Sequence, residues 1–328
     1  MYVEIVNGLS GAKLDAWKKF IEGAGILYDP LIEKTAILWD GEEIVASGSR
    51  YNNILKLIAV NPSRRGEDLT SAVIGALRND AFKDGYSHLF LYTSPKNQPV
   101  FSSLFFYPVA ATDKVVLLEN KRGGVTDFIN ALPRKSSCNK VGSVVMNCNP
   151  FTLGHKYLIE LAARECDLLY VFVLSEDKSE FSSEDRMEMV KVGVAHLNNV
   201  IVAPTGPYLI SSATFPTYFL KERDSITDVQ CLLDVEIFVR HFAKNLDIKY
   251  RYVGSEPSSK LTLAYNETLK RHLPEMGVTV KEVKRLENDG RPISASTARA
   301  LIKEGRRDGL SALLPETTTN FLLKKGYI

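Results

Sequence analysis

Apolar runs of strand length alternate with amphipathic segments throughout the second half of the chain. Strands are predicted at 141–147, 167–175, 199–204, 248–254 and 278–286, with helices at 154–165, 183–197 and 228–246 and a helical C-terminal end. The run DLLYVFVLS at 167–175 is continuous, as in strands that are buried on both faces of a sheet. This alternation predicts a doubly wound parallel sheet over residues 140–328.

The first half of the chain follows a different pattern. Asp40 and Gly41 stand between apolar stretches and predict a hairpin turn. Further elements are predicted as a strand at 54–60, a helix from about Asp68, a strand at 88–94, a short helix at 99–106 and a strand at 113–120. This order predicts a compact α+β domain over residues 1–120. Residues 121–139 contain Gly-Gly and a proline and are predicted as a linker, with a short helix at 125–131.

Length, charge and cysteine content narrow the class of protein. A chain of 328 residues exceeds one ordinary core, which agrees with two domains. The net charge of +2 does not favour a nucleic-acid binder. The four cysteines have no regular spacing, which indicates a reducing compartment rather than zinc or a disulfide scaffold. No stretch has the apolar length of a signal peptide or a membrane span, so we expect a cytoplasmic protein without a membrane or nucleic-acid partner.

The stretch NCNPFTLGH, residues 147–155, lies where the first strand of the second domain runs into a helix. Ligands of open parallel sheets bind at the carboxyl ends of strands, and a helix N-terminus attracts anions. Gly154 would let a phosphate approach the backbone, Thr152 offers a hydroxyl, and His155 offers an imidazole N–H. A histidine near a helix start is otherwise a cap or a surface residue. This stretch therefore predicts a phosphate site, and the alternative is that His155 is only a cap or a surface residue.

A second stretch, ISASTAR at 293–299, opens a helix after the last predicted strand. Ser294 and Ser296 are capping residues, and Arg299 lies one turn into the helix. An N-capped surface helix would explain these residues without a ligand. Together the two stretches predict that the first and last parts of one domain close around a polyphosphate.

The two stretches resemble the paired motifs of the nucleotidyltransferase superfamily, His/Thr-x-Gly-His and Ile-Ser-x-Ser/Thr-x-x-Arg. That superfamily is Rossmann-like and transfers adenylyl groups from ATP with release of pyrophosphate. Longer stretches at 142–163, 208–221 and 251–266 resemble the citrate lyase ligase family along nearly the whole chain. That family joins an N-terminal acetyltransferase-like (GNAT-like) domain to a nucleotidyltransferase domain.

The resemblance implies an enzyme that uses ATP and Mg²⁺. Acetate would be activated as acetyl-adenylate, and the acetyl group would then pass to a thiol on the acyl carrier subunit of citrate lyase. That thiol belongs to the CoA-like phosphoribosyl-dephospho-CoA group of the carrier, and AMP and pyrophosphate are released. No protein side chain is expected to bind a metal.

The resemblance also implies roles for single residues. Thr152 and His155 would bind the phosphates of ATP, with His155 steadying the transition state at the α-phosphorus. Ser296 and Arg299 would hold the β- and γ-phosphates. Further residues implied to line the nucleotide site are Asn147, Asn149, Phe151, Gly154, Gly254, Ser255, Glu256, Ile293 and Ser294. Glu256 stands where the superfamily commonly has an aspartate. Arg186 would either reach phosphate or be a solvated helix residue.

Two departures from the family patterns bear on substrates. Met146 and Asn147 replace a glycine-rich approach to the first motif, which suits a small acceptor, and the stretch at 211–219 is a candidate acceptor wall, with a buried aromatic loop as the alternative. In the first domain, Arg64-Arg65-Gly66 matches half of the acetyltransferase pyrophosphate loop, but Glu67 and Asp68 place carboxylates there. We therefore expect this domain to cradle the CoA-like group or the carrier without transferring acetyl itself, or to be a scaffold.

Two other functions compete with the ligase. One is an adenylyltransferase that makes a dinucleotide from ATP and a small phosphate acceptor, which would keep AMP in its product. The other is an acyltransferase that uses acetyl-CoA through the first domain. The resemblance along the whole chain favours the ligase over the first, and the altered glycine loop argues against the second.

Overall fold

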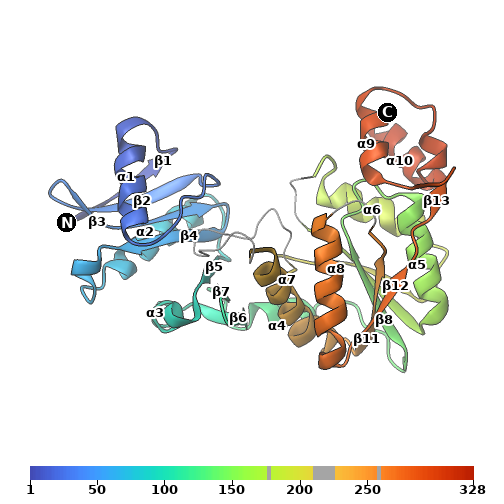
Figure 1. Ribbon diagram of the computed structural model, residues 1–328, viewed down its shortest axis with the longest axis horizontal. Coiled ribbons are helices and arrows are strands. Elements are labelled where there is room, and N and C mark those ends of the chain that lie inside the picture. Colours follow the sequence, from blue (N-terminus) through green and yellow to red (C-terminus); the bar gives the residue numbers. More distant parts are fainter. Residues whose placement is uncertain (176–178, 210–225, 257–259) are drawn as a thin grey trace. The chain divides into compact units, whose positions relative to one another are not determined.

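The computed structural model describes residues 1–175, 179–209, 226–256 and 260–328 (Figure 1). The chain divides into two compact units: the first consists of Met1–Gly124 and a later segment that includes the described residues 226–233, and the second contains the other described residues from Val125 onward. Val125 lies inside the segment that was predicted as a linker. The short helix predicted there is α4 (Gly124–Asn130), and the ring of Phe128 packs against Tyr208 and Phe242 of the second unit.

The first unit contains one seven-stranded sheet. Its strands, in spatial order, are β1 (Tyr2–Asn7), β2 (Lys34–Asp40), β3 (Glu43–Tyr51), β4 (Ile54–Val60), β5 (Phe90–Thr93), β7 (Val116–Glu119) and β6 (Tyr107–Ala111). All neighbours are antiparallel except β4 and β5, which pair in parallel only at their first residues, Ile54 with Phe90 and Leu55 with Leu91. The predicted α+β class is confirmed, and this mixed sheet fits a GNAT-like domain.

Two helices cover opposite faces of this sheet. Neighbouring side chains of β2 point to opposite faces, so Ala36 and Leu38 join one core and Ile37 joins the other. The first core lies under α2 (Leu69–Lys83) and the second under α1 (Gly11–Gly23). Gly48 lets α2 approach closely, since a Cβ there would lie 2.8 Å from Val73 Cγ1.

Several local predictions in the first unit need correction. The hairpin turn is Gly41-Glu42, one residue later than predicted, because Asp40 pairs with Glu43 and Gly41 adopts a φ of +61°. The helix α3 ends at Ser103 (Gln98–Ser103), earlier than predicted. The elements β1, α1 and β6 were not predicted, because they are short or carry many charges.

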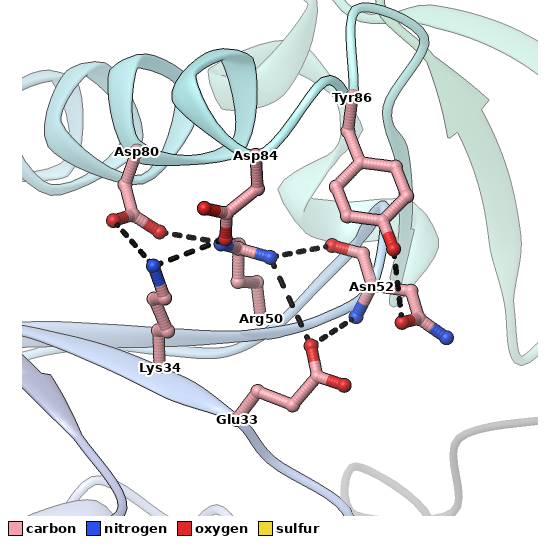
Figure 2. A network of polar contacts seen from close by, with 7 residues as sticks. All are labelled: Glu33, Lys34, Arg50, Asn52, Asp80, Asp84 and Tyr86. Atoms are coloured by element: carbon pink, nitrogen blue, oxygen red, sulfur yellow. Dashed lines mark hydrogen bonds and ion pairs between the residues drawn. The ribbon is translucent and has the colours of Figure 1, made fainter.

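A charged cluster closes the C-terminal end of α2 (Figure 2). Asp80 and Asp84 lie at the negative end of the helix dipole, where carboxylates are unfavourable. The buried Arg50 compensates them: its Nε donates to Asp80 Oδ2 over 2.7 Å, one Nη pairs with Asp84, and the other donates to the Asn52 carbonyl over 3.0 Å. Lys34 Nζ lies 3.2 Å from Asp80 and 3.0 Å from Asp84. The cluster ties β2 and β3 to α2.

The second unit is built on five parallel strands. They are β8 (Val141–Met146), β9 (Leu168–Val173), β10 (Val200–Pro204), β11 (Ile248–Gly254) and β12 (Thr279–Val283), in the order β10-β9-β8-β11-β12. The chain starts at the central β8, winds outward to β10, and returns to β11 on the other side. The predicted doubly wound sheet is confirmed, and the winding direction reverses between β8 and β11.

The described helices of this unit pack on both faces of the sheet (Figure 1). They are α5 (Leu153–Glu165), α6 (Ser183–Gly193), α8 (Lys260–His272), α9 (Ala295–Lys303) and α10 (Glu316–Lys325). Helix α7 (Ile226–Ile237) is divided between the units, with its residues up to Leu233 assigned to the first. The helix predicted at 228–246 is α-helical only to Ile237 and continues as a π-helical turn over Phe238–Ala243. Helix α8 was not predicted.

Short elements complete the fold. A small hairpin pairs β13 (Glu287–Asn288) with β14 (Arg291–Pro292) directly before α9. Short 3₁₀ turns lie at Pro62–Arg64, Pro95–Asn97, Pro274–Met276 and Leu310–Ala312. The core of the second unit includes Val144, Val171, Ile159, Phe181 and Leu322, which join β8 and β9 to α5, α10 and the segment before α6.

Candidate active site

Helix α5 begins in a capping box formed by Thr152 and His155. The hydroxyl of Thr152 accepts a hydrogen bond from the His155 backbone N–H over 3.3 Å, and the Thr152 backbone N–H donates to His155 Nδ1 over 3.0 Å. Because Nδ1 accepts a hydrogen bond, the neutral imidazole carries its proton on Nε2. The predicted phosphate ligand Thr152 is thus buried as an N-cap, and it orients the donor of His155.

The imidazole of His155 rests on a fixed support. The buried ring of Phe151 stacks on it with centroids 6.1 Å apart and planes 13° apart. Phe151 in turn packs against Gly193 of α6, where a Cβ would lie 2.3 Å from the ring. Desolvation, and then the positive charge of Arg285, lowers the pKa of His155 to about 4. His155 is therefore a neutral hydrogen-bond donor near pH 7.

The loop between β8 and α5 is held by polar contacts from α6 and the segment before it. Asn149 Oδ1 accepts from the Phe181 backbone N–H over 3.2 Å. The Asn147 carbonyl and Oδ1 accept from Arg186 Nη1 over 3.0 and 2.5 Å, and Arg186 Nε donates to the Phe181 carbonyl over 3.1 Å. Arg186 is fully buried, so the alternative of a solvated helix residue is wrong. Its hydrogen bonds, two of them to backbone carbonyls, offset the cost of burial.

The second motif starts α9 and is joined to the first. Ser294 is the N-cap, and its hydroxyl accepts from the Ser296 backbone N–H over 3.2 Å. Arg299 Nη1 donates to the Asn149 carbonyl over 2.5 Å, and its Nη2 donates to Ser296 Oγ over 3.1 Å. One arginine therefore bridges two stretches that are 150 positions apart in sequence.

The N-termini of α5 and α9 also touch directly. The carbonyl of Ile293 lies 3.6 Å from the position that a Cβ on Gly154 would occupy. The Leu153 backbone N–H donates to the Leu313 carbonyl over 2.8 Å, which fixes the start of α5 against the C-terminal region. Two helix N-termini thus lie beside each other at the sheet, an arrangement suited to a polyanion.

The end of β11 carries the third group of predicted residues. Ser255 follows Gly254, and its backbone N–H donates to the Val283 carbonyl of β12 over 2.8 Å. Arg285 lies across this turn: its Nε donates to the Ser255 carbonyl over 2.7 Å, and one Nη pairs with Glu256. The Glu256 side chain is only 5% exposed and is therefore committed to this ion pair.

Arg285 was not among the site residues predicted from the sequence. A signal was present, because a basic pair follows the last strand of the sheet at its carboxyl end, beside the predicted turn at Gly254. Its pairing with Glu256 spans 29 positions and could not be read from the sequence. The candidate acceptor wall at 211–219 lies outside the described residues.

The loop before α2 in the first unit is closed by its own charges. Arg64 Nε donates to Glu67 Oε1 over 2.7 Å, and its Nη1 donates to Asp40 Oδ2 over 2.9 Å. Asp68, the residue before α2, adopts a φ of +57° and makes no capping hydrogen bond with its side chain. The cation that would meet a pyrophosphate in an acetyltransferase loop is thus paired with two carboxylates.

Surveys of the described residues add three observations. They contain no group of three or more His, Cys, Asp or Glu side chains suited to hold a metal ion. Within the same residues, no helix combines the length and apolarity needed to cross a bilayer. All four cysteines are free thiols, and three of them are buried: Cys148, Cys166 and Cys231.

Comparisons with known proteins cover both units. A family model described as the citrate lyase ligase C-terminal domain matches residues 141–322. The citrate (pro-3S)-lyase ligase of Klebsiella pneumoniae is 40% identical over 289 residues, 86% of this chain and 84% of that protein. The corresponding ligase of Haemophilus influenzae is 36% identical over 322 residues, 96% of each chain.

Enzymes of a different class match a smaller part of this chain. The phosphopantetheine adenylyltransferase of Streptococcus gordonii is 27% identical over 159 residues, 45% of this chain and 95% of that protein. The ligases therefore align along most of the chain, whereas the adenylyltransferase aligns with less than half of it. On this ground the chain belongs to the citrate lyase ligase family, as the longer stretches at 142–163, 208–221 and 251–266 predicted.

Proposed function

We propose that the protein is an acid–thiol ligase that activates acetate with ATP and acetylates the CoA-like thiol on the acyl carrier subunit of citrate lyase. The observation that carries the proposal is the hydrogen bond from Arg299 to the Asn149 carbonyl. It joins both motifs at the switch point between β8 and β11, where the winding direction of the chain reverses. The names of the two ligase relatives support citrate lyase as the partner.

In the first step, a carboxylate oxygen of acetate attacks the α-phosphorus of MgATP, and pyrophosphate leaves. Acetate is ionised at neutral pH, so this step needs no general base. The Nε2–H of His155 donates to the α-phosphate, while Ser296 and Arg299 hold the β- and γ-phosphates. Gly154 exposes the start of α5 to the phosphates. Part of the phosphate charge would be neutralised by Mg²⁺ supplied with the nucleotide.

In the second step, the thiolate of the carrier's prosthetic group attacks the acetyl carbon. The carbon–oxygen bond to the phosphate breaks, AMP leaves with the bonding electrons, and a thioester remains. The residues at the end of β11, Gly254 and Ser255, lie beside the adenosine in this proposal. Asn147, Asn149 and Phe151 act through the loop and the imidazole that they support.

The first unit receives the carrier or its CoA-like group and does not transfer acetyl itself. The pairing of Arg64 with Glu67 and Asp40 supports this division, because it places two carboxylates on a cation of the loop that would meet a pyrophosphate in an acetyltransferase. The four free thiols support a reducing, cytoplasmic setting. Neither nucleic acid nor membrane is a partner in this proposal.

Product analysis tests the proposed function. Purified protein would be incubated with ATP, acetate and the carrier subunit that bears its prosthetic group. We expect a thioester on the carrier, detected by mass spectrometry, together with free AMP and pyrophosphate. AMP retained in a dinucleotide product would instead establish the adenylyltransferase alternative, and acetylation that requires acetyl-CoA but not ATP would establish the acyltransferase.

A further inference from the structure

The proposed site pairs an uncharged hydrogen-bond donor, His155, with a nearby arginine, Arg285, that has no role in the proposed reaction so far. His155 is neutral near pH 7 and offers only its Nε2–H. Attack on the α-phosphorus builds negative charge on its oxygens, and a cation aimed there stabilises that charge. Arg299 is assigned to the β- and γ-phosphates in the proposed function and is anchored to Asn149 and Ser296 at the start of α9, so the α-phosphate calls for another cation.

Arg285 is the cation that lies toward the imidazole. Its charge is one of the two causes that lower the pKa of His155. The residue follows the end of β12, and its side chain runs over Gly254, whose Cβ position would lie 3.9 Å from Arg285 Cγ. It therefore sits at the carboxyl edge of the sheet, next to the switch point between β8 and β11.

Three contacts fix the arginine on one side. Its backbone N–H donates to Ser255 Oγ over 3.2 Å, its Nε donates to the Ser255 carbonyl over 2.7 Å, and one Nη pairs with Glu256. The remaining Nη has no hydrogen-bond partner within the described residues 1–175, 179–209, 226–256 and 260–328. The side chain is 31% exposed, so this edge of the guanidinium is accessible. A planar guanidinium held along one edge presents its other edge to an oxyanion.

We propose that Arg285 binds the α-phosphate of the nucleotide as the charged partner of the neutral donor His155, and that Ser255 and Glu256 hold it in position. The proposal rests on the proposed function insofar as the ligand is ATP. Glu256 is then a positioning residue, which explains an acid buried beside a nucleotide site: it neutralises Arg285 only on the side that faces away from the phosphate.

A purely structural role makes different predictions. If Arg285 only braces β11 against β12, its replacement lowers stability, and the replacement of Glu256 has the same effect. Ligand affinity then changes no more than it does for a surface arginine. A phosphate-binding role instead predicts a loss that depends on which phosphates the ligand carries.

AMP and pyrophosphate separate the two halves of ATP. AMP carries only the α-phosphate, so Arg285→Gln should weaken AMP binding by about 10-fold or more while pyrophosphate binding changes less than about 2-fold. Arg299→Gln should show the reverse order. Arg306→Gln is the matched control, because Arg306 is a 62% exposed arginine of the same unit whose guanidinium pairs with Glu304. Calorimetric titration of the full chain measures the affinities of the wild type and the three variants for both ligands.

Kinetics and spectroscopy sharpen the test. In acetate-dependent exchange of pyrophosphate into ATP, Arg285→Gln should lower kcat by about 10²-fold, and Arg285→Lys should retain part of the lost rate. The kcat of Glu256→Gln should lie between those of the Arg285 variants and that of the wild type. The imidazole signals of His155 should titrate at a higher pH in Arg285→Gln, since one of two causes of the low pKa is gone.

Each outcome decides the proposal. AMP affinity and kcat in Arg285→Gln equal to those of Arg306→Gln would overturn it. A wild-type protein that binds AMP through Arg285 but shows no acetate-dependent exchange would contradict the proposed function and leave the phosphate contact established. Equal losses of AMP and pyrophosphate affinity, together with a melting temperature lowered by more than about 4 °C, would identify a brace and reject the proposal.

Discussion

Two arginines of this molecule are paired with carboxylates in opposite ways. In the first unit, Arg50 is 1% exposed, and Nε and both Nη groups have partners, two of them aspartates (Figure 2). In the second unit, Arg285 is 31% exposed and pairs with one carboxylate along one edge. A fully paired buried cation fixes elements of the fold, whereas a cation anchored on one side has charge left for a ligand.

The same contrast extends to the loops that precede helices. The loop before α2 joins Arg64 to Glu67 and Asp40, so this cation is neutralised within the first unit. The starts of α5 and α9 instead lie beside each other, and their side chains serve as caps and bridges. Arg64 is therefore already paired with carboxylates, whereas the two helix starts are prepared for an anion.

Breaking the closed cluster should have the largest effect. Arg50→Met leaves Asp80 and Asp84 without their buried partner, and we expect the free energy of unfolding of the first unit to fall by about 3–5 kcal/mol. Lys13→Met is the control, because it breaks an exposed pair with Glu4 that is worth less than about 1 kcal/mol. Chemical denaturation measures both, and equal losses would show that the cluster is not a brace.

Separating the two motifs should be the next largest effect. Arg299→Gln removes charged hydrogen bonds to Asn149 and Ser296, each worth about 1.5–3 kcal/mol. We expect the KM for ATP in the exchange reaction to rise by about 10- to 100-fold, with folding retained. A variant with normal ATP affinity would mean that the bridge shapes the fold without contributing to the nucleotide site.

Crowding the support of the imidazole should have a smaller effect. In Gly193→Ala the added Cβ would lie 2.3 Å from the ring of Phe151, so the ring and the stacked His155 must shift. We expect a loss of about 1–3 kcal/mol in stability and reduced exchange activity. Gly75→Ala, in α2, is the control: no atom lies within 4 Å of its added Cβ, and helix propensity predicts a slight gain in stability. Unchanged exchange activity in Gly193→Ala would show that the packing of Phe151 on Gly193 does not position the His155 imidazole.

The smallest effect concerns pH. His155 has a folded pKa of about 4 against about 6.5 in the unfolded chain, so the unfolded state takes up a proton first as the pH falls. Stability should therefore be lost between about pH 6.5 and 4, by on the order of 1–2 kcal/mol at pH 5. His155→Gln, which has no titrating ring, should lack this part of the pH dependence. A NMR titration of His155 with a midpoint near 6.5 would contradict the account.

Much of the second unit could be predicted from the sequence, because its signals are periodic and local. Continuous apolar strands such as 167–175 indicate a parallel sheet, and carboxyl ends of such strands lie at one edge. That rule alone brings the turn after β8 and the turn after β11 together. The first unit was harder, since β1 and β6 are short edge strands and lack a strong pattern.

The remaining features depend on contacts that no local pattern encodes. Arg186 has the sequence context of a solvated helix residue, yet three of its hydrogen bonds go to Asn147 and Phe181 and allow full burial. The pairing of Arg285 with Glu256 depends on the parallel register of β11 and β12. The neutral state of His155 follows from its burial and from Arg285, neither of which the motif reveals.

The most direct test of the central claim is acetate-dependent exchange of labelled pyrophosphate into ATP, with the carrier subunit present. Wild type and His155→Ala would be compared with His196→Ala, which alters a half-exposed histidine of the same unit paired with Glu160. We predict exchange that requires acetate, is retained in His196→Ala, and falls by about 10²- to 10³-fold in His155→Ala. Exchange that is independent of acetate, or equal in the two histidine variants, would contradict acetate activation at this site.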